Sequence, residues 1–456
     1  MKINTLWLVI AACIMLVSCG NGKDNGKSTA KLNATITVAD SVDATGNYSG
    51  IQLLIINQNP GSEVIDTLFI SKTDSSGFIS GEVKVPKQGL YPILISRRGV
   101  NLLYAQVILA ANDTLTISGE LPGITNNFKV DSREERAVKV YTRVDTGFNR
   151  VLNFMRSGAI ADSLIADEIF KWSNLLWDVY EEHPGTIAAT LGAKESIRIL
   201  KGFDNDLMQK RLNETLTSDQ MIVYAADFGK AFHAEVHGLE ASIAYLDSLK
   251  GLTKSPEIIQ ALDKVIVESY YDSSKTDKAH ELLNRFKTQY KKDEKALEWA
   301  EKVDYDLTYL SEGKSIPDFS FVSMAGDSIS NKSLIGQTYV LEVSPVTNQM
   351  YKDQFDRSVI IKQIYQGQNL GFYTIPLEVS AITVGAFFDE QENPWPVARP
   401  GSFDTNEIVK VLNVSRVPTR FLVDEDGKIE RKYVGEDFDD VLKGLNKIFN
   451  RNNQEN

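Results

Sequence analysis

The chain has 456 residues, of which 43% are hydrophobic and 24% charged, and its formal net charge is −12. A length of this order predicts two to three domains, and the acidic balance argues against nonspecific binding to nucleic acid. After the first 18 residues no apolar run is long enough for a membrane-spanning helix, so none is predicted there. Both cysteines, Cys13 and Cys19, precede any segment that could fold as a globular domain.

The first 18 residues, 1–18, are predicted to be an export signal. Lys2 supplies a positive charge, and residues 6–17 form an apolar run that is too short for a membrane span. The run ends in the sequence LVSCG, which resembles a bacterial lipobox. This resemblance implies that Cys19 is acylated, becomes the first residue of the mature protein and anchors it to a membrane.

Residues 19–30 are polar and glycine-rich, which predicts a flexible tether behind the anchor. No aspartate follows Cys19, and this favours the outer membrane of the cell envelope over the inner membrane. The sequence leaves open whether the protein faces the periplasm or the cell surface.

Residues 31–125 alternate apolar and polar side chains in short runs that are separated by turn residues. Residues 34–38 (ATITV) and 114–117 (TLTI) are examples of such runs, and residues 74–77 (DSSG) form a turn signal. The pattern predicts an antiparallel β-sandwich or open barrel. The order of its strands and turns resembles an uncharacterised β-domain that often precedes thioredoxin-like domains in envelope lipoproteins.

Residues 132–312 change to a helical period, for example at residues 165–172 and 258–266. Pro256 suits the first position of a helix, and residues 255–290 have the size of two helices with a short polar break. We predict a helical connector or a small bundle.

Two histidines in this zone, His233 and His237, are four residues apart and would share one face of a helix. Such a pair can hold a metal, but Glu235 does not stand where the zincin motif requires its glutamate, and no further ligand cluster stands out. We therefore predict two ordinary surface or boundary histidines, with no metal and no cofactor.

The third zone contains two separated motifs. Residues 315–341 include SIPDFSF, AGDSIS and SLIGQTYVL, and residues 412–429 read LNVSRVPTRFLVDEDGKI. Together they resemble periplasmic thioredoxin-like proteins of the thiol reductase and peroxiredoxin superfamily. The resemblance implies an α/β thioredoxin-like domain over residues 315–450, with a cis-proline at Pro418. The predicted fold class is thus multidomain: an all-β sandwich-like domain, an α-helical middle and a C-terminal thioredoxin-like fold.

The resemblance fails at the catalytic motif. Where the family has W-C-x-x-C, this chain reads PVTNQMYKD over residues 345–353. One alignment puts Gln349 and Lys352 at the two cysteine positions, and an alignment shifted by one residue puts Asn348 and Tyr351 there. An amide, an amine or a phenol cannot replace a thiolate in disulfide exchange or peroxide reduction. We therefore carry over no catalytic residues.

A peptide-binding groove could persist without cysteines. In the family, the backbone of the residue before the cis-proline pairs with an extended peptide, and here that residue is Val417. The groove is predicted to include Val417, Pro418, Thr419 and Trp395, with Tyr351 and Phe355 as further candidate lining residues. In the alternative interpretation Pro418 serves the fold alone and the aromatic side chains belong to the core.

Two functions remain open from the sequence. In the first, the protein is a membrane-anchored envelope lipoprotein whose redox-inactive thioredoxin-like domain acts as a scaffold, an accessory subunit or a module that binds another envelope protein or peptide. In the second, it is an envelope enzyme independent of cysteine, for example a hydrolase. No Gly-x-Ser-x-Gly, HExxH or P-loop motif favours the second function.

Overall fold

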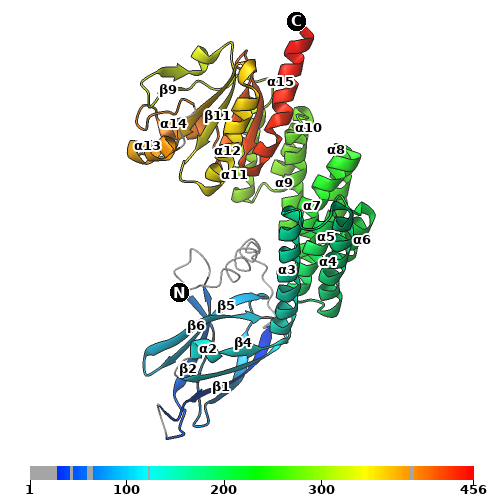
Figure 1. The fold of residues 1–456 in the computed structure, drawn as a ribbon, viewed down its shortest axis with the longest axis vertical. Coiled ribbons are helices and arrows are strands. Elements are labelled where there is room, and N and C mark those ends of the chain that lie inside the picture. Colours follow the sequence, from blue (N-terminus) through cyan, green and yellow to red (C-terminus); the bar gives the residue numbers. More distant parts are fainter. Residues whose placement is uncertain (1–27, 42–44, 59–64, 122–123, 391–394, 456) are drawn as a thin grey trace. The chain divides into compact units, whose positions relative to one another are not determined.

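The computed structural model describes residues 28–41, 45–58, 65–121, 124–390 and 395–455. The predicted signal peptide, Cys19 and most of the predicted tether lie outside the described residues. The chain divides into two compact units, Met1–Val236 with Ala244–Ile259 and His237–Ile243 with Gln260–Asn456. Figure 1 shows the elements in chain order, and each unit is described by itself.

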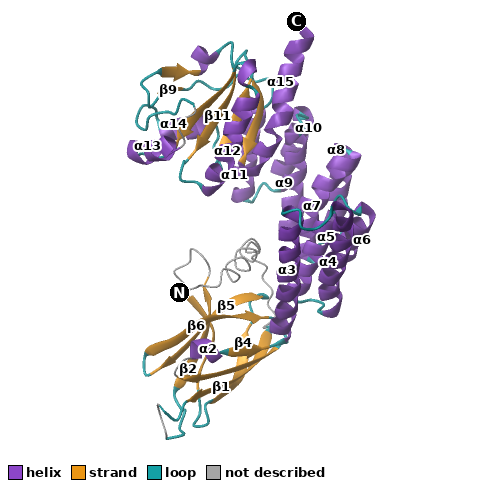
Figure 2. Ribbon diagram, in the orientation of Figure 1, coloured by secondary structure: helices purple, strands orange, loops and turns teal. Residues whose placement is uncertain are grey.

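The first unit begins with a β-sandwich (Figure 2). Its strands are β1 (Thr29–Val38), β2 (Ile51–Gln58), β3 (Ile65–Lys72), β4 (Phe78–Lys84), β5 (Gly89–Arg97), β6 (Val100–Leu109), β7 (Thr114–Leu121) and β8 (Lys129–Asp131). They form two sheets, in the orders β4-β1-β7-β8 and β3-β2-β5-β6. Every second side chain of β1 from Ala30 to Val38 is buried, as alternation in the sequence predicts.

One pairing departs from the prediction of an antiparallel domain. β1 runs antiparallel to β4 but parallel to β7. Strands β2, β3, β5 and β6 belong to the other sheet, so the chain leaves the first sheet before β7 returns beside β1. A parallel neighbour requires such a long connection, and local sequence patterns do not reveal it.

The helical middle follows the sandwich, as predicted. Its helices are α2 (Ile124–Asn127), α3 (Arg133–Arg156), α4 (Asp162–Glu182), α5 (Ile187–Leu200), α6 (Asn205–Thr215), α7 (Asp219–His237), α8 (Leu239–Lys250), α9 (Pro256–Asp272), α10 (Thr276–Gln289), α11 (Glu294–Tyr305) and the π-helical turn η1 (Asp306–Leu310). The predicted helix start at Pro256 is confirmed, and the Ser255 hydroxyl accepts the Ile258 amide at 3.3 Å. The boundaries between the two units fall at the last residue of α7 and within α8 and α9.

The second unit contains a mixed sheet of order β12-β11-β13-β14. Its elements are β9 (Ser320–Val322), β10 (Ser328–Ser330), η2 (Asn331–Leu334), β11 (Thr338–Ser344), α12 (Gln349–Ile364), η3 (Gln366–Gln368), β12 (Leu370–Pro376), α13 (Ala381–Glu390), α14 (Thr405–Val411), β13 (Thr419–Val423), β14 (Ile429–Val434), η4 (Gly435–Asp440) and α15 (Val441–Glu455). β11 is parallel to β12 and antiparallel to β13. Strands β11, β12 and β13 are buried along their whole lengths, because helices cover both faces of the sheet.

Two apolar clusters lie on the two faces of this sheet. Residues of α12, α13 and α15 pack on one face, against side chains such as Val340 and Phe372. The β9–β10 hairpin and α14 pack on the other face, against side chains such as Leu341 and Phe421. Among the described helices of both units, none combines the length and the apolarity that crossing a membrane requires.

Candidate functional site

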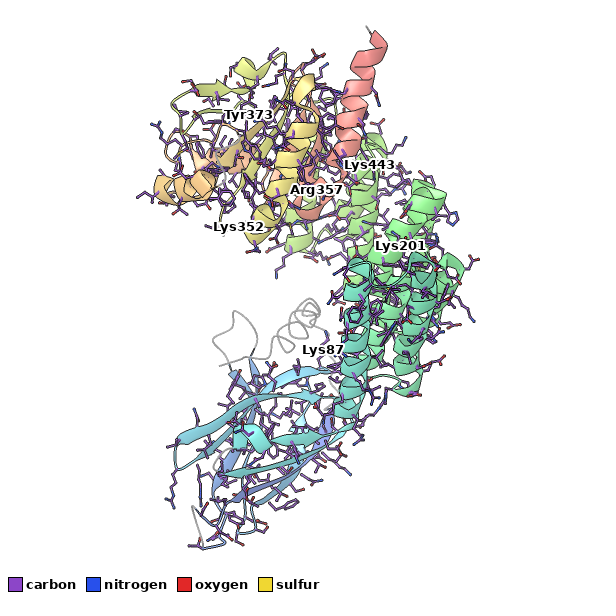
Figure 3. All side chains as sticks on the ribbon, in the orientation of Figure 1. Lys87, Lys201, Lys352, Arg357, Tyr373 and Lys443 are labelled. Carbon is purple, nitrogen blue, oxygen red and sulfur yellow. The ribbon has the colours of Figure 1, made fainter. Side chains whose placement is uncertain are left out.

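The start of α12 is where the family resemblance places a redox-active pair. Asn348 is the N-cap of this helix, and its side-chain oxygen accepts the Tyr351 backbone N–H at 3.0 Å. Gln349 is exposed and donates to the Asp353 carboxylate at 2.8 Å. Lys352 is exposed on the same first turn (Figure 3). In either alignment, the two aligned positions therefore carry no thiol.

The Tyr351 side chain points into the core instead of toward solvent. It is fully buried, and its hydroxyl donates to the Glu342 carboxylate at 3.2 Å. Burial, together with the negative charge of Glu342, holds the pKa of Tyr351 well above its ordinary value of 10.0. The phenol consequently stays protonated near neutral pH and cannot act as a nucleophile there.

Glu342 is the centre of a buried polar network in the middle of β11. One carboxylate oxygen accepts hydrogen bonds from Arg420 at 2.8 Å and Ser358 at 3.2 Å. The other oxygen accepts them from Tyr351 at 3.2 Å and Thr374 at 2.9 Å. Four donors thus compensate a charge that has no access to water.

Arg420 on β13 is the ionic partner of Glu342. The two residues stand directly opposite each other in the β11–β13 register, and each side chain is only 1% exposed. Arg420 also donates to Gln354 at 2.7 Å, and its guanidinium lies 4.1 Å from the centre of the Phe438 ring. Gln354 in turn donates to the carbonyl of Gly435 at 3.0 Å. The network joins α12 to three strands of the sheet.

Sequence reasoning missed Glu342 and Arg420, although a signal was present. Each is a single charged residue inside an otherwise apolar or hydroxyl-bearing strand, TYVLEVS for β11 and TRFLV for β13. Charged residues are rarely buried unless they are paired. Two such exceptions in one predicted sheet therefore indicate each other as partners.

The Val417–Pro418 peptide bond is cis, which is the geometry that the resemblance implies. Val417 is half-buried, whereas Pro418 and Thr419 are buried. The Thr419 hydroxyl donates to the Arg416 carbonyl at 2.6 Å. Of the residues in the Val417–Thr419 turn, only Val417 is not buried.

The expectation that Trp395 lines an open groove is wrong. Its side chain is only 4% exposed, and its indole N–H donates to the hydroxyl of Thr374 at 2.9 Å. Its ring centre lies 5.1 Å from those of both Phe355 and Phe372. Tyr351 and Phe355 are buried in the same cluster. These aromatic residues are core, as the alternative interpretation had it, because each ring packs against others on the covered face of the sheet.

An exposed apolar segment lies beside the start of α12. Val379 is 95% exposed and Ile382 is 85% exposed. The neighbouring Glu378 carboxylate accepts hydrogen bonds from both the backbone N–H and the hydroxyl of Thr347, at 3.0 and 3.1 Å. These bonds hold Glu378 next to the β11–α12 connection, with Val379 following it in the loop and Ile382 in the first turn of α13. We call Val379 and Ile382 the apolar tip.

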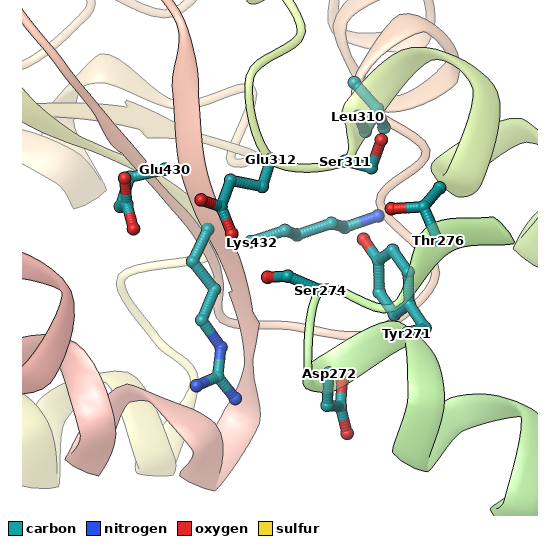
Figure 4. A pocket seen from close by; sticks show the side chains of 10 residues that line it. Tyr271, Asp272, Ser274, Thr276, Leu310, Ser311, Glu312, Glu430 and Lys432 are labelled. Carbon is teal, nitrogen blue, oxygen red and sulfur yellow. The ribbon is translucent and has the colours of Figure 1, made fainter. Parts of the chain in front are cut away.

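A surface pocket lies elsewhere in the second unit (Figure 4). Its lining residues are Tyr271, Asp272, Ser274, Thr276, Leu310, Ser311, Glu312, Glu430, Arg431 and Lys432. The Lys432 ammonium group binds both oxygens of Asp306, at 2.8 and 2.9 Å, and the Asn413 carbonyl at 3.0 Å. All three donors of the ammonium group are thereby used.

Burial opposes both charges of this pair: it lowers the pKa of Lys432 and raises the pKa of Asp306. The hydrogen bonds nevertheless join η1 to β14. We interpret the pair as a structural junction and not as a nucleophilic amine.

The two histidines of the helical middle lie on α7. The ring of His233 lies 4.3 Å from that of Tyr245 on α8. Within the described part of the chain, no three histidine, cysteine, aspartate or glutamate residues are grouped so that they could hold a metal ion.

A curated relative supports a thioredoxin-like fold for part of the chain. The chain is 26% identical over 148 residues to the thiol-disulfide oxidoreductase ResA of Bacillus cereus, which covers 30% of this chain and 78% of that protein. No family model matches the chain. Over about 30% of its length the chain has a thioredoxin-like fold, in addition to a sheet-rich N-terminal region and a helical middle.

Similar solved structures include a putative thiol:disulfide interchange protein DsbE from Chlorobium tepidum, at 20% identity, 30% coverage of this chain, 98% of that chain and a TM-score of 0.27. A second is the thioredoxin domain of a thiol-disulfide oxidoreductase from Bacteroides vulgatus, at 15% identity, 30% and 97% coverage and a TM-score of 0.28. A third is a thiol-disulfide oxidoreductase from Bacteroides fragilis, at 19% identity, 29% and 99% coverage and a TM-score of 0.27.

Proposed function

We propose that this protein is a lipoprotein of the bacterial cell envelope, anchored through Cys19, most simply to the outer membrane. In this proposal residues 315–450 form the thioredoxin-like domain, and the domain carries out neither thiol–disulfide exchange nor peroxide reduction. It acts as a scaffold or accessory subunit that binds another envelope protein or peptide. The names of the similar proteins refer to a redox activity that we do not transfer to this chain.

The loss of redox activity rests on one observation. The four residues that could stand at the cysteine positions are Asn348, Gln349, Tyr351 and Lys352, and none has a thiol. Asn348 is engaged as a helix cap and Tyr351 as a buried donor to Glu342. Disulfide exchange requires a thiolate as the attacking group, so these side chains cannot perform it.

The apolar tip supports a binding role at the end of the domain where α12 begins. Single exposed aliphatic side chains are common on protein surfaces, but Val379 and Ile382 follow Glu378, which Thr347 holds beside the β11–α12 connection. Burial of one such side chain in a partner contributes roughly 1.5–3 kcal/mol. We propose that a partner covers these two side chains.

Two measurements test the redox part of the proposal. The mature protein should neither accelerate the reduction of insulin by dithiothreitol nor consume hydrogen peroxide. A positive control is the double variant Asn348→Cys and Tyr351→Cys, or Gln349→Cys and Lys352→Cys for the other alignment. A robust rate in the unaltered protein would disprove the proposal.

The binding part requires a site-resolved experiment. A photo-crosslinking amino acid at position 382 should give a discrete heterologous product in intact cells, and the variant Val379→Asp should reduce it. The same crosslinker at Ile364, which is 66% exposed at the far end of α12, is the matched control. Equal products from both positions, or none from position 382, would contradict the apolar tip as the contact.

The alternative of a cysteine-independent enzyme gains no support from the pocket of Figure 4, because the amine of Lys432 is fully engaged by Asp306 and Asn413. We therefore keep the binding role as the single proposed function.

A further inference from the structure

The β-sandwich of the first unit has an edge strand whose composition is unusual for an edge. β6 closes the sheet β3-β2-β5-β6, and among the described residues only β5 pairs with it. Its sequence, VNLLYAQVIL, contains no charged residue, no proline and no glycine. Natural proteins commonly protect edge strands with charged residues, proline or a β-bulge, because the unpaired backbone groups can pair with another strand. Of these devices β6 has only a register shift, opposite Ile95 and Ser96.

The other edge strands of the sandwich differ in this respect. β3 contains Asp66 and Lys72, and β4 contains Glu82 and Lys84. The short β8 consists of Lys129, Val130 and Asp131. Within the described sandwich, β6 is therefore the edge strand that lacks charged residues. Its pairing with β5 is regular from Leu103 to Leu109.

A row of apolar side chains crosses the outer face of the sheet and ends at this edge. Leu54 pairs with Ile70 on one side and with Leu94 on the other, and Leu94 pairs with Tyr104. Ile70 and Tyr104, at the two ends of the row, are 57% and 63% exposed. Neighbours along such a row lie on the same face of the sheet, so the row presents its aromatic end at the edge strand without charges.

We propose that β6 pairs antiparallel with β6 of a second copy of this chain, about a two-fold axis at Tyr104. A two-fold contact must be complementary to itself. β6 meets this condition because its neutral sequence brings no like charges together at any register. The inference does not depend on the proposed function of the thioredoxin-like domain.

The register follows from the alternation of side chains. Leu103 and Val107 are buried toward the core, whereas Tyr104 and Gln106 are exposed on the opposite face. Residues that are directly opposite each other in an antiparallel pair point to the same face, and a slip by one residue would put apolar side chains on the wrong side. An axis at Tyr104 keeps both faces continuous, pairs the two Tyr104 rings and joins the two apolar rows.

Disulfide trapping in intact cells tests this arrangement with the full chain. Directly opposed residues of antiparallel strands have Cα atoms about 4.5–5.5 Å apart, a distance that a disulfide can bridge. Tyr104→Cys should therefore form a covalent homodimer under mild oxidation. The matched control is Ile70→Cys, which places an equally exposed cysteine at the other end of the same row. The Tyr104→Cys dimer should form roughly 10-fold faster than the control, because pairing raises the effective concentration of the two thiols.

A second pair of variants tests the proposed β6–β6 pairing without introducing a cysteine. Tyr104→Lys should convert the dimer to a monomer in sedimentation, because it brings two positive charges together at the axis, whereas Ile70→Lys should leave the dimer intact. Three results would each overturn the proposal: equal trapping of the Tyr104→Cys and Ile70→Cys variants, a monomeric unaltered protein, or a crosslinked product of Tyr104→Cys that contains a different polypeptide.

Discussion

The Glu342–Arg420 pair allows the sharpest test of how the second unit is held together. Each side chain is 1% exposed, and the two are joined by a 2.8 Å hydrogen bond between adjacent strands. The variant Arg420→Met keeps the approximate length of the side chain but removes its charge and its bond to Gln354. Glu342 would then be a buried carboxylate with only neutral donors.

Breaking a buried ion pair by removing one partner costs about 3–5 kcal/mol. Three donors to Glu342 would remain, from Ser358, Tyr351 and Thr374, so the carboxylate would not be wholly uncompensated. We expect the free energy needed to open the β11–β13 strand pair locally to fall by about 3–5 kcal/mol. The backbone amides of β11 and β13 would then exchange with solvent roughly 100- to 5,000-fold faster.

Hydrogen–deuterium exchange of peptides from β11 and β13 measures this loss in the full chain. Unfolding of the whole chain is less informative, because a multidomain protein need not unfold in one step. The matched control is Lys428→Met, whose side chain is 50% exposed and whose ion pair with Asp426 is 3.9 Å long. The control should change the opening free energy by less than about 0.5 kcal/mol.

The size of the loss provides the decisive outcome. A difference in opening free energy between the unaltered protein and Arg420→Met below about 1 kcal/mol at pH 7, or an equal loss in Lys428→Met and Arg420→Met, would refute the reasoning.

Three further predictions concern single side chains. Asn348→Ala removes the N-cap of α12 and should cost about 1 kcal/mol, whereas Asn348→Asp should keep most of this stability, as measured by hydrogen–deuterium exchange of peptides from α12. Gly229→Ala would put a Cβ closer to the ring of Tyr245 than van der Waals contact allows, so overpacking should lower stability by about 1–3 kcal/mol, and an unchanged melting temperature would show that the ring moves freely. Burial raises the pKa of Glu134 above 4.5, so the unaltered protein should lose stability relative to Glu134→Gln as pH rises through that window, and a constant difference between pH 4 and 7 would contradict this.

Local patterns in the sequence predicted much of the fold because their causes are local. The alternation of β1 reflects one buried face, and the start of α9 reflects a proline at a position that needs no N–H donor. The parallel pairing of β1 with β7 was not predictable in this way, since it depends on how distant strands are ordered. The predictions about Cys19 and the tether remain predictions, because those residues lie outside the described part of the chain.

The candidate site shows the same division. The absence of cysteine after residue 19 is a property of composition, and it is enough to argue against thiol chemistry without any structure. The positions of the remaining side chains in the fold do not follow from composition. Trp395 was expected to line a groove but is enclosed by Phe355 and Phe372, because its burial depends on helices and strands that are distant in the chain.

By itself, the sequence determined which chemical groups this protein possesses: no thiol in its folded region, a negative net charge and a charge-free segment at residues 100–109. Tertiary structure decided which groups meet. Glu342 and Arg420 are 78 residues apart and become partners only when β11 and β13 align. β6 becomes an edge only when the strand order of its sheet is set. The physical reason is that side-chain chemistry is carried by each residue, whereas burial and pairing are properties of segments that fold together.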